Sequence, residues 1–594
     1  MSVAHAPNRN AAFAEALVSE LVRCGVRNAC VSPGSRSAPL AIAAADAGGL
    51  RCFTPVDERA SGFFALGMAK ALREPVLLVC TSGSAATHYG PAVVEAHHAG
   101  VPLLVLTADR PPELREWGAG QTIDQQRLFG THVRWFAETA LPERGPALLR
   151  YARALACRAA DAATATPPGP VHLNMPFREP LDPRPVAADA LEGEAADPGV
   201  AGRGDRPYTR VRHGLATPSP DAVASLADRM SACRRGLVAC GPLDATDDTA
   251  AAIASLASRL DWPLLAEPAS QLRSGPHTRD TLVLGAGDWI LRDADFRAAH
   301  RPDFVLRFGA APTSKAFRRW LEASPPESLV LVDPARRWHD PSHLASDVFC
   351  ADERRLCSLL ERRLGAGGAP RSRWSADFAA AQARAETAIE AALDGDALVE
   401  PRIVRAIAAA LPEGAQLYVG NSMPIRDVDG FWPVSAAPLR VLVNRGTNGI
   451  DGNLASAAGA AVARGTPTLL LTGDLAFLHD LSGALWASQV DAPLVVVVVD
   501  NDGGGIFSQL PVADLIDGSR FERLFRTPHG RDLVPLAAAL GARTERVTSV
   551  AHLSAALKEA LARPGFQLLL VPTERDANVA LRGEVAAAVA QAIA

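Results

Sequence analysis

The sequence contains few cysteines, and none of them forms a recognisable motif. Nine cysteines occur as single residues, with no C-x-x-C pair and no histidine cluster at zinc-binding spacing. This pattern excludes a disulfide-rich scaffold and a structural zinc site of the usual spacing. It favours buried free thiols in a reducing cytosol, with a catalytic cysteine as the alternative.

Long apolar runs and an excess of positive charge are also missing. No run approaches the roughly 18 residues of a membrane-spanning helix, and the longest, PLVVVVVD at 493–500, predicts a strand buried on both faces. The first residues, MSVAHAPNRNAAFAEAL, lack the basic and apolar segments of a signal peptide. The net charge of −5 favours neither nucleic acid nor an anionic membrane. We therefore expect a cytoplasmic protein that acts on small molecules.

At 594 residues the chain is too long for one hydrophobic core. Short apolar runs alternate with helical patterns, for example at 58–72 and 85–99, and this order predicts parallel sheets covered by helices. Segments rich in Ala, Pro and Gly at 182–220 and 365–373 are typical of linkers. The predicted fold class is α/β, with three doubly wound parallel-sheet domains at 1–185, 215–365 and 375–594.

Two loops of the last block carry oxygen ligands. TLLLTGD ends in Gly473-Asp474, and VVVVVDNDGGG carries Asn501 27 positions later, with an expected helix at 475–489 and a strand at 494–499 between them. Ligands of open parallel sheets bind in the loops that follow the strands. A carboxylate, an amide oxygen and a backbone carbonyl near Gly503 suit Mg²⁺ that is shared with phosphate. A Gly-Asp pair by itself is more often an ordinary turn.

This spacing resembles the fingerprint of thiamine-diphosphate-dependent enzymes. The resemblance implies that Asp474, Asn501 and the Gly503 carbonyl bind Mg²⁺ or Mn²⁺, which anchors the cofactor's diphosphate. The sequence departs from the commonest motif at Leu475, where glycine is usual, and at Asp500, the first place of an Asn-Asn pair. The metal-binding asparagine is the second of that pair, so ligation is retained. Asp500 is expected to support the site or to end the strand.

An acid that activates the cofactor is expected in the first block. In FTPVDERASGFF (53–64), Glu58 follows a strand and begins an apolar-faced helix. By itself this residue fits a solvated charge at a helix N-terminus equally well. The resemblance makes Glu58 the acid that bonds to the aminopyrimidine ring, and Ile450 the apolar residue that holds the cofactor bent. In the family the acid and the metal meet across a subunit interface, which implies a homodimer or homotetramer.

Six segments extend the resemblance along nearly the whole chain to one family, the 2-succinyl-5-enolpyruvyl-6-hydroxy-3-cyclohexene-1-carboxylate (SEPHCHC) synthases. The segments are SPGSRS, TSGSAA, TADRPPEL, GNSMPIRD, NRGTNGIDG and DNDGGGIFSQLP. The resemblance implies a transferase of the carboligase type in menaquinone biosynthesis. It would decarboxylate 2-oxoglutarate and add the succinyl carbanion to isochorismate by conjugate addition. Both substrates are dianions, and arginine is suited to binding carboxylates.

The same resemblance assigns the substrate-binding residues. Arg426 and Arg445, which also count as catalytic, hold the distal carboxylate of 2-oxoglutarate together with Ser422. Asn421, Ser422 and Ile506 are further cofactor contacts. Isochorismate is assigned to Ser35, Arg36, Arg110, Gln121 and Lys315. The apolar wall is assigned to Ile506, Phe507 and Leu510.

Two departures from the family pattern affect these assignments. Gly120 stands where the family has asparagine before Gln121, and Ala316 stands where a second basic residue follows Lys315. Two other functions stay open: a pyruvate-specific thiamine enzyme of the acetolactate synthase kind, and a non-catalytic cofactor-binding scaffold. The first has no need of the Arg426 and Arg445 pair, and the second has no need of Glu58.

Overall fold

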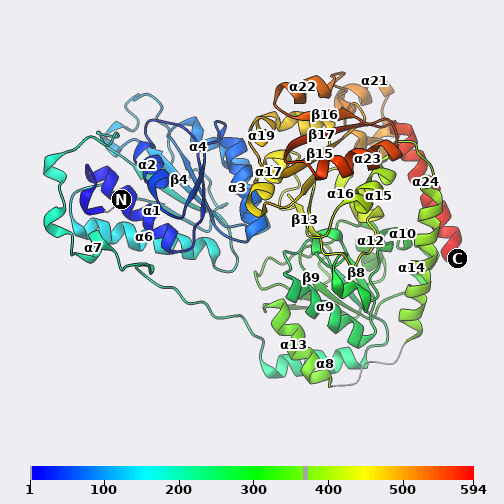
Figure 1. Cartoon of the computed structure of the whole chain (residues 1–594). Helices are drawn as coiled ribbons and strands as arrows, with labels where there is room; N and C mark the ends of the chain where they lie inside the picture. The colour runs from blue at the N-terminus through cyan, green and yellow to red at the C-terminus, as the bar shows by residue number, and fades with distance from the viewer. Residues whose placement is uncertain (1–2, 366–371) are drawn as a thin grey trace. The chain divides into compact units, whose positions relative to one another are not determined.

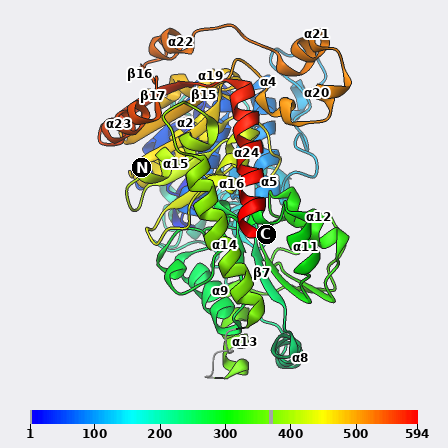
Figure 2. The same ribbon diagram turned by 90° about the vertical axis from the view of Figure 1, so that its right-hand side faces the viewer.

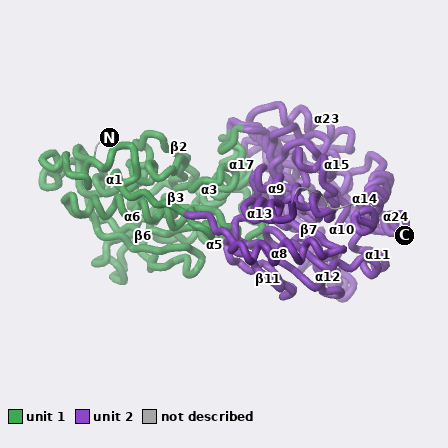
Figure 3. The backbone as a smooth tube through the Cα atoms, turned by 90° about the horizontal axis from the view of Figure 1, so that it is seen from below, with its two compact units in different colours: residues 1–213, 444–465, 479–490 green, residues 214–443, 466–478, 491–594 purple. Residues whose placement is uncertain are grey.

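The computed structural model describes residues 3–365 and 372–594, and its strands form three parallel sheets. The predicted α/β class with three parallel-sheet domains is therefore confirmed. By contacts the chain divides into two compact units, which Figure 3 colours separately. Unit 1 comprises residues 1–213, 444–465 and 479–490, and unit 2 comprises the remaining segments. Most of the expected linker at 365–373 lies outside the described residues.

The sheet of unit 1 has six parallel strands in the order β2-β1-β3-β4-β6-β5 (Figure 1). Its central strands are apolar and buried, as expected for a sheet covered on both faces. The strand order reverses between β1 and β3, so the loops after them lie at a switch point that favours ligand binding. The strands are β1 (Asn28–Val31), β2 (Arg51–Phe53), β3 (Val76–Cys80), β4 (Leu103–Asp109), β5 (Trp135–Glu138) and β6 (Val171–Pro176). The main helices are α1 (Arg9–Arg23), α2 (Ala38–Asp46), α3 (Glu58–Leu72), α5 (Gly90–Ala99) and α6 (Pro146–Thr164).

Unit 2 contains the other two sheets. The middle sheet has the order β11-β10-β9-β7-β8, and the last sheet has β13-β12-β14-β15-β17-β16, which repeats the strand order of unit 1. Helices α14 (Arg373–Ala392) and α24 (Arg575–Ile593) lie side by side in Figures 1 and 2. The middle strands are β7 (Gly236–Cys240), β8 (Leu264–Ala266), β9 (Phe304–Phe308), β10 (Ser328–Val332) and β11 (Asp347–Phe349). The last six are β12 (Gln416–Val419), β13 (Arg440–Val443), β14 (Thr468–Gly473), β15 (Pro493–Asp500), β16 (Arg543–Arg546) and β17 (Gly565–Pro572).

Two helices that follow strands of the last sheet belong to unit 1. They are α17 (Asn453–Arg464) and α19 (Leu481–Ala487), and α17 packs against α3. The contact is close: a Cβ on Gly67 would lie 1.9 Å from the Ser456 carbonyl oxygen, and one on Gly459 would lie 2.0 Å from that of Phe64. Only glycine at these two positions permits such an approach of the backbones.

The expected elements need two corrections. The helix predicted at 58–72 matches α3, but the one predicted at 85–99 is two helices, α4 (Ser84–His88) and α5. Pro91 lies in the first turn of α5, where a missing N–H costs nothing, and a new helix begins there. The helix predicted at 475–489 is likewise split, into α18 (Asp474–His479) and α19.

The predictions about apolar segments and thiols can also be compared with the structure. Residues 494–499 of β15 are buried, as predicted from the apolar run. No described helix has the length and apolar character needed to cross a membrane. All nine cysteines are free and five are buried, but Cys52 on the edge strand β2 is exposed, so the expectation of buried thiols is wrong for that residue.

Candidate functional site: a cation site and an arginine site

Asp474 is the first residue of α18, directly after β14, and is 3% exposed. Its Oδ1 accepts the N–H of Leu475 at 2.6 Å, and its Oδ2 accepts the N–H of Gly503 at 2.8 Å. Because β14 and β15 pair in parallel, with Gly473 opposite Val499, the loops after the two strands meet. The sheet thus brings Asp474 and the Gly503 loop together, as the spacing predicts.

Asn501 follows β15 and presents an unsatisfied oxygen. Its Oδ1 is buried and has no hydrogen-bond partner among the described residues, while its Nδ2 lies 3.4 Å from Glu400 Oε1. Buried polar atoms are almost always bonded, so this oxygen needs a ligand that the protein does not provide. A divalent cation bound to amide and carboxylate oxygens meets that need, and the donor set suits Mg²⁺ or Mn²⁺.

The Gly503 backbone fits the third place in this set. Its φ is 132°, and a Cβ at this position would lie 2.1 Å from the Arg526 carbonyl oxygen, so only glycine is compatible with the loop. The carbonyl of Gly503 accepts the N–H of Gly505 at 3.0 Å, and a carbonyl oxygen has a second lone pair for a cation.

His529 adjoins the same site and was missed by sequence reasoning. Its Nε2 lies 3.3 Å from Asp474 Oδ2 and 3.5 Å from Asp500 Oδ1, and ligand atoms of the three residues lie within 4.8 Å of one another. Asp500 is the last residue of β15, so it ends the strand, which is one of its two expected places. His529 comes from an irregular loop after residue 526, for which no spacing in the sequence signals a ligand.

The electrostatics of the site call for positive charge. Burial, with a smaller contribution from Asp500, raises the pKa of Asp474 to about 6, although N–H donors and His529 oppose the rise. Burial also raises the pKa of Glu400. Glu400 lies 4.0 Å from Arg582, which also contacts Asp427. Glu400 accepts a hydrogen bond from the Asn501 amino group, and the Asn501 carbonyl oxygen is left without a partner among the described residues.

A second group of predicted residues in unit 2 surrounds the end of β12. Asn421 is buried, and Ser422 has a φ of 70°, a strained conformation for serine that marks a sharp strand-to-helix turn. Arg426 lies in α16 (Met423–Phe431) and donates to the Ser422 carbonyl. The apolar residues Ile506 and Phe507 lie in the short helix η7 (Gly505–Gln509), and all three predicted wall residues, Leu510 included, are half-buried.

In unit 1, Glu58 is the first residue of α3 and is half-buried. Asp57 caps the helix, because its Oδ1 accepts the N–H groups of Arg59 at 2.8 Å and Ala60 at 3.4 Å. Glu58 is therefore not needed as the cap. Arg445 and Ile450, in the segment between β13 and α17, belong to unit 1 as well, whereas Arg426 belongs to unit 2.

Four of the five candidates for isochorismate binding lie in loops that follow β1 and β4, and two of them contact Ser82 in the loop after β3. Arg110 donates to Ser82 Oγ and, at 3.0 Å, to the Gln121 carbonyl, and Gln121 Nε2 donates to the Ser82 carbonyl at 2.9 Å. Burial lowers the pKa of Arg110, and the charge of Arg36 adds to this. Arg36 donates to the Phe177 carbonyl at 2.9 Å, and Ser35 is exposed. The loops thus create a positive site, whose arginines already have protein partners.

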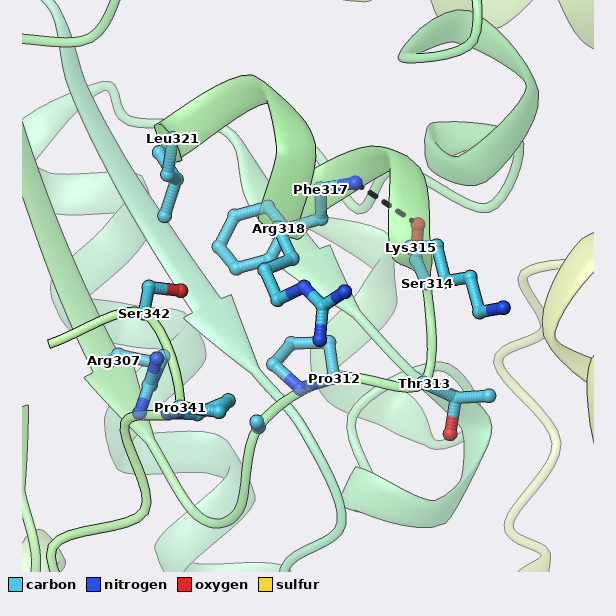
Figure 4. Close-up of a pocket in the computed structure, with 11 residues that line it drawn as sticks. Arg307, Pro312, Thr313, Ser314, Lys315, Phe317, Arg318, Leu321, Pro341 and Ser342 are labelled. Atoms are coloured by element: carbon cyan, nitrogen blue, oxygen red, sulfur yellow. Dashed lines mark hydrogen bonds between the residues drawn. The ribbon is translucent and has the colours of Figure 1, made fainter. Parts of the chain in front are cut away.

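Lys315, the fifth candidate, belongs to unit 2 and follows β9 of the middle sheet. It begins α12 (Lys315–Ala323), is exposed, and lines a pocket of about 120 Å³ together with Arg307 and Arg318. In Figure 4 its amine points away from both guanidinium groups. Three basic residues therefore line the pocket, although Ala316 stands where the family has a second basic residue after Lys315.

Comparison with known proteins bears on these sites. Three family models of thiamine pyrophosphate (thiamine diphosphate) enzymes match this chain. The model of the N-terminal TPP binding domain matches residues 11–128, that of the middle domain 204–419, and that of the C-terminal TPP binding domain 429–571. A benzoylformate decarboxylase from Polynucleobacter necessarius has a similar structure, with a TM-score of 0.67 over 95% of this chain and 98% of that one. At 18% identity it supports the fold alone.

Full-length relatives narrow the family. Enzymes named 2-succinyl-5-enolpyruvyl-6-hydroxy-3-cyclohexene-1-carboxylate synthase are similar to this chain. The one from Myxococcus xanthus is 47% identical and the one from Geobacillus kaustophilus 44%, each over 96% of both chains. The one from Haloarcula marismortui is 40% identical over 99% of both. The chain therefore belongs to the thiamine pyrophosphate enzymes and, among them, to the SEPHCHC synthase family.

Proposed function

We propose that the chain is a SEPHCHC synthase, which decarboxylates 2-oxoglutarate and joins the remaining succinyl unit to isochorismate in menaquinone biosynthesis. The observation that carries the proposal is the similarity over nearly the full length to relatives of this name. The bond from the Gly503 N–H to Asp474 and the orphaned oxygen of Asn501, at the expected cofactor motif, support it. When bound, thiamine diphosphate accepts the electron pair that the departing CO₂ leaves behind.

The cofactor would be held at two places. Asp474, Asn501 and the Gly503 carbonyl would bind Mg²⁺ or Mn²⁺ and with it the diphosphate. Asn421, Ser422 and Ile506, which also belong to unit 2, would add further contacts to the cofactor. Glu58 would hold a proton at the pyrimidine nitrogen, for which its half-buried place beside a separate capping residue leaves it available. Ile450 would pack against the cofactor and keep it bent.

The substrates would be held by positive charge. Arg426, Arg445 and Ser422 would bind the distal carboxylate of 2-oxoglutarate, and the positive loops of unit 1 would bind isochorismate through Ser35, Arg36, Arg110 and Gln121. Lys315 would add a charge from the middle domain. Ile506, Phe507 and Leu510 would exclude water, which matters because early protonation of the succinyl carbanion would release succinic semialdehyde in place of product.

The assembly and the location of the protein are part of the proposal. Glu58 and the cation site belong to different units of the chain. The family pattern, in which the acid and the metal meet across a subunit interface, favours a homodimer or homotetramer with shared active sites. We expect a cytoplasmic protein with functional domains at 1–185, 215–365 and 375–594. Size-exclusion chromatography with light scattering would measure the assembly, and a monomer with full activity would contradict the shared site.

Product analysis tests the function directly. The purified chain with thiamine diphosphate, Mg²⁺, 2-oxoglutarate and isochorismate should form SEPHCHC, detected by mass spectrometry. Omitting isochorismate should leave only slow release of succinic semialdehyde. The same reaction with pyruvate should give little product. A chain that consumes pyruvate and leaves 2-oxoglutarate unchanged would be a different thiamine enzyme.

A further inference from the structure

A buried carboxylate in unit 1 has no place in the proposed reaction. Glu95 lies on α5 and is 2% exposed. Its Oε1 accepts the N–H of Gly446 at 3.0 Å, and its Oε2 accepts the N–H of Thr447 at 2.7 Å and the Thr447 hydroxyl at 3.0 Å. One side chain of α5 thus holds the two peptide groups that directly follow Arg445.

Lys70 completes this arrangement from α3. Its Nζ donates to Glu95 Oε1 at 3.1 Å and to Asn444 Oδ1 at 2.8 Å, and its side chain is 9% exposed. Lys70 is one of only three lysines in the chain. The ammonium compensates the buried charge of Glu95, which would otherwise be costly. Together the two residues bind the loop on both sides of Arg445, at Asn444 and at residues 446–447.

The backbone of this loop approaches α5 as closely as its atoms allow. A Cβ on Gly446 would lie 2.7 Å from the Glu95 carbonyl oxygen and 2.9 Å from the Ala99 nitrogen. The loop also continues through Ile450 into α17, which packs against α3. The same helix α3 begins with Glu58, so the Lys70 and Glu95 contacts tie the Arg445 loop to the element that carries the proposed activating acid.

We infer that Glu95 is a positioning residue for donor recognition: it fixes the loop from which Arg445 reaches the distal carboxylate of the 2-oxo acid. This inference rests on the proposed function, in which Arg445 binds that carboxylate. A guanidinium must be oriented to bind a carboxylate in a bidentate manner, and two fixed peptide groups beside its Cα supply that orientation. Glu95 touches neither substrate nor cofactor in this scheme.

The test compares Glu95→Gln with the parent in the full-length, cofactor-loaded enzyme. Glutamine has the same size, but its amino group would face an N–H donor of the loop. The bonds from either Gly446 or Thr447 would therefore be lost. The KM for 2-oxoglutarate should rise about tenfold with kcat nearly unchanged. The use of pyruvate, which lacks the distal carboxylate, should stay the same. In the background of Arg445→Ala, Glu95→Gln should cause no further loss, since the two residues act through one contact.

Two further variants guard against a loss of folding. Thr447→Val removes only the hydroxyl bond to Glu95 and should raise the same KM about twofold to threefold. Glu559→Gln is the matched control, because Glu559 pairs with Arg563 on the surface and should leave both substrates unaffected. Amide hydrogen exchange of residues 444–450 should speed up in Glu95→Gln while the β4 segment stays protected.

The outcomes separate the inference from the function on which it rests. An unchanged KM for 2-oxoglutarate in Glu95→Gln, or an equal loss with pyruvate, overturns the positioning role. If the parent itself shows no preference for 2-oxoglutarate, the proposed function fails. Amide hydrogen exchange at residues 444–450 then remains as the test of whether Glu95 fixes the loop. Faster exchange at 444–450 in the variant would keep Glu95 as the residue that fixes the loop, and unchanged exchange would overturn that as well.

Discussion

The cation site of unit 2 and the arginine site of unit 1 occupy corresponding places in two sheets with the same strand order. Asp474 and Asn501 follow the third and fourth strands of the last sheet, and Ser82 and Arg110 follow the third and fourth strands of the first sheet. The polar groups differ in one respect. Asn501 Oδ1 is buried without a partner among the described residues, whereas Arg110 already donates to Ser82 and Gln121.

This difference reflects two kinds of ligand. A cation that stays bound can complete a set of oxygens that the protein leaves unsatisfied, and the fold is stabilised when it binds. A substrate enters and leaves at every turnover. Its arginines can bond to protein groups while the site is empty and to the substrate when it binds, since an unpaired buried guanidinium would cost several kcal/mol. Variants should therefore have larger effects at the cation site.

The largest effect is expected for Asp474→Ala. The change removes the charged member of the cation site, so metal-dependent retention of thiamine diphosphate should be lost while the unit still folds. Cofactor retention after gel filtration with and without Mg²⁺ measures this, with the exposed Asp514→Ala as the control. Parent-like binding of the cofactor by Asp474→Ala would show that the site holds no cation.

Glu58→Gln should separate activation from binding. Glutamine keeps the size but cannot act as the acid, and such groups contribute about 10²–10⁴ in rate. We expect kcat to fall by that order with the cofactor still bound, and proton exchange at C2 of the bound thiamine, followed by NMR, to slow in parallel. Exchange at the parent rate would remove Glu58 from the mechanism.

Arg445→Ala should have the next largest effect, and it is specific to one substrate. Loss of one member of a desolvated charge pair costs roughly 2–5 kcal/mol, and each 1.4 kcal/mol is about tenfold. The kcat/KM for 2-oxoglutarate should fall by about 30-fold to a few thousandfold, and the preference over pyruvate should largely disappear. A variant that keeps this preference would leave the choice of donor to other residues.

The smallest effect is expected for Arg110→Ala. When a carboxylate binds, Arg110 gives up its bonds to Ser82 and Gln121 for bonds to the carboxylate. The substitution therefore removes only the difference between the two sets of bonds, and the KM for isochorismate should rise about tenfold. Steady-state kinetics at saturating 2-oxoglutarate measure this rise. A loss larger than that of Arg445→Ala would contradict the view that the arginine site of unit 1 is satisfied in advance.

Local patterns made some features predictable. The apolar β-branched run at 493–500 and the helix that begins at Glu58 could be derived from periodicity, because both depend on neighbours in the sequence. The breaks in the helices at 85–99 and 475–489 were missed, although Pro91 signals the first. His529, Glu95 and Lys70 could not be found in this way, because each meets its partners only after distant segments pack together.

The sequence by itself determined the α/β class and the strand-end positions of Asp474 and Asn501, since these follow from the order of short apolar runs and from residues beside them. Tertiary structure alone decided which of these groups stay unsatisfied. The orphaned Asn501 oxygen depends on Glu400, about a hundred residues earlier, and the fixed Arg445 loop depends on Glu95 and Lys70. Hydrogen bonding and burial are properties of the packed chain, and no local spacing encodes them.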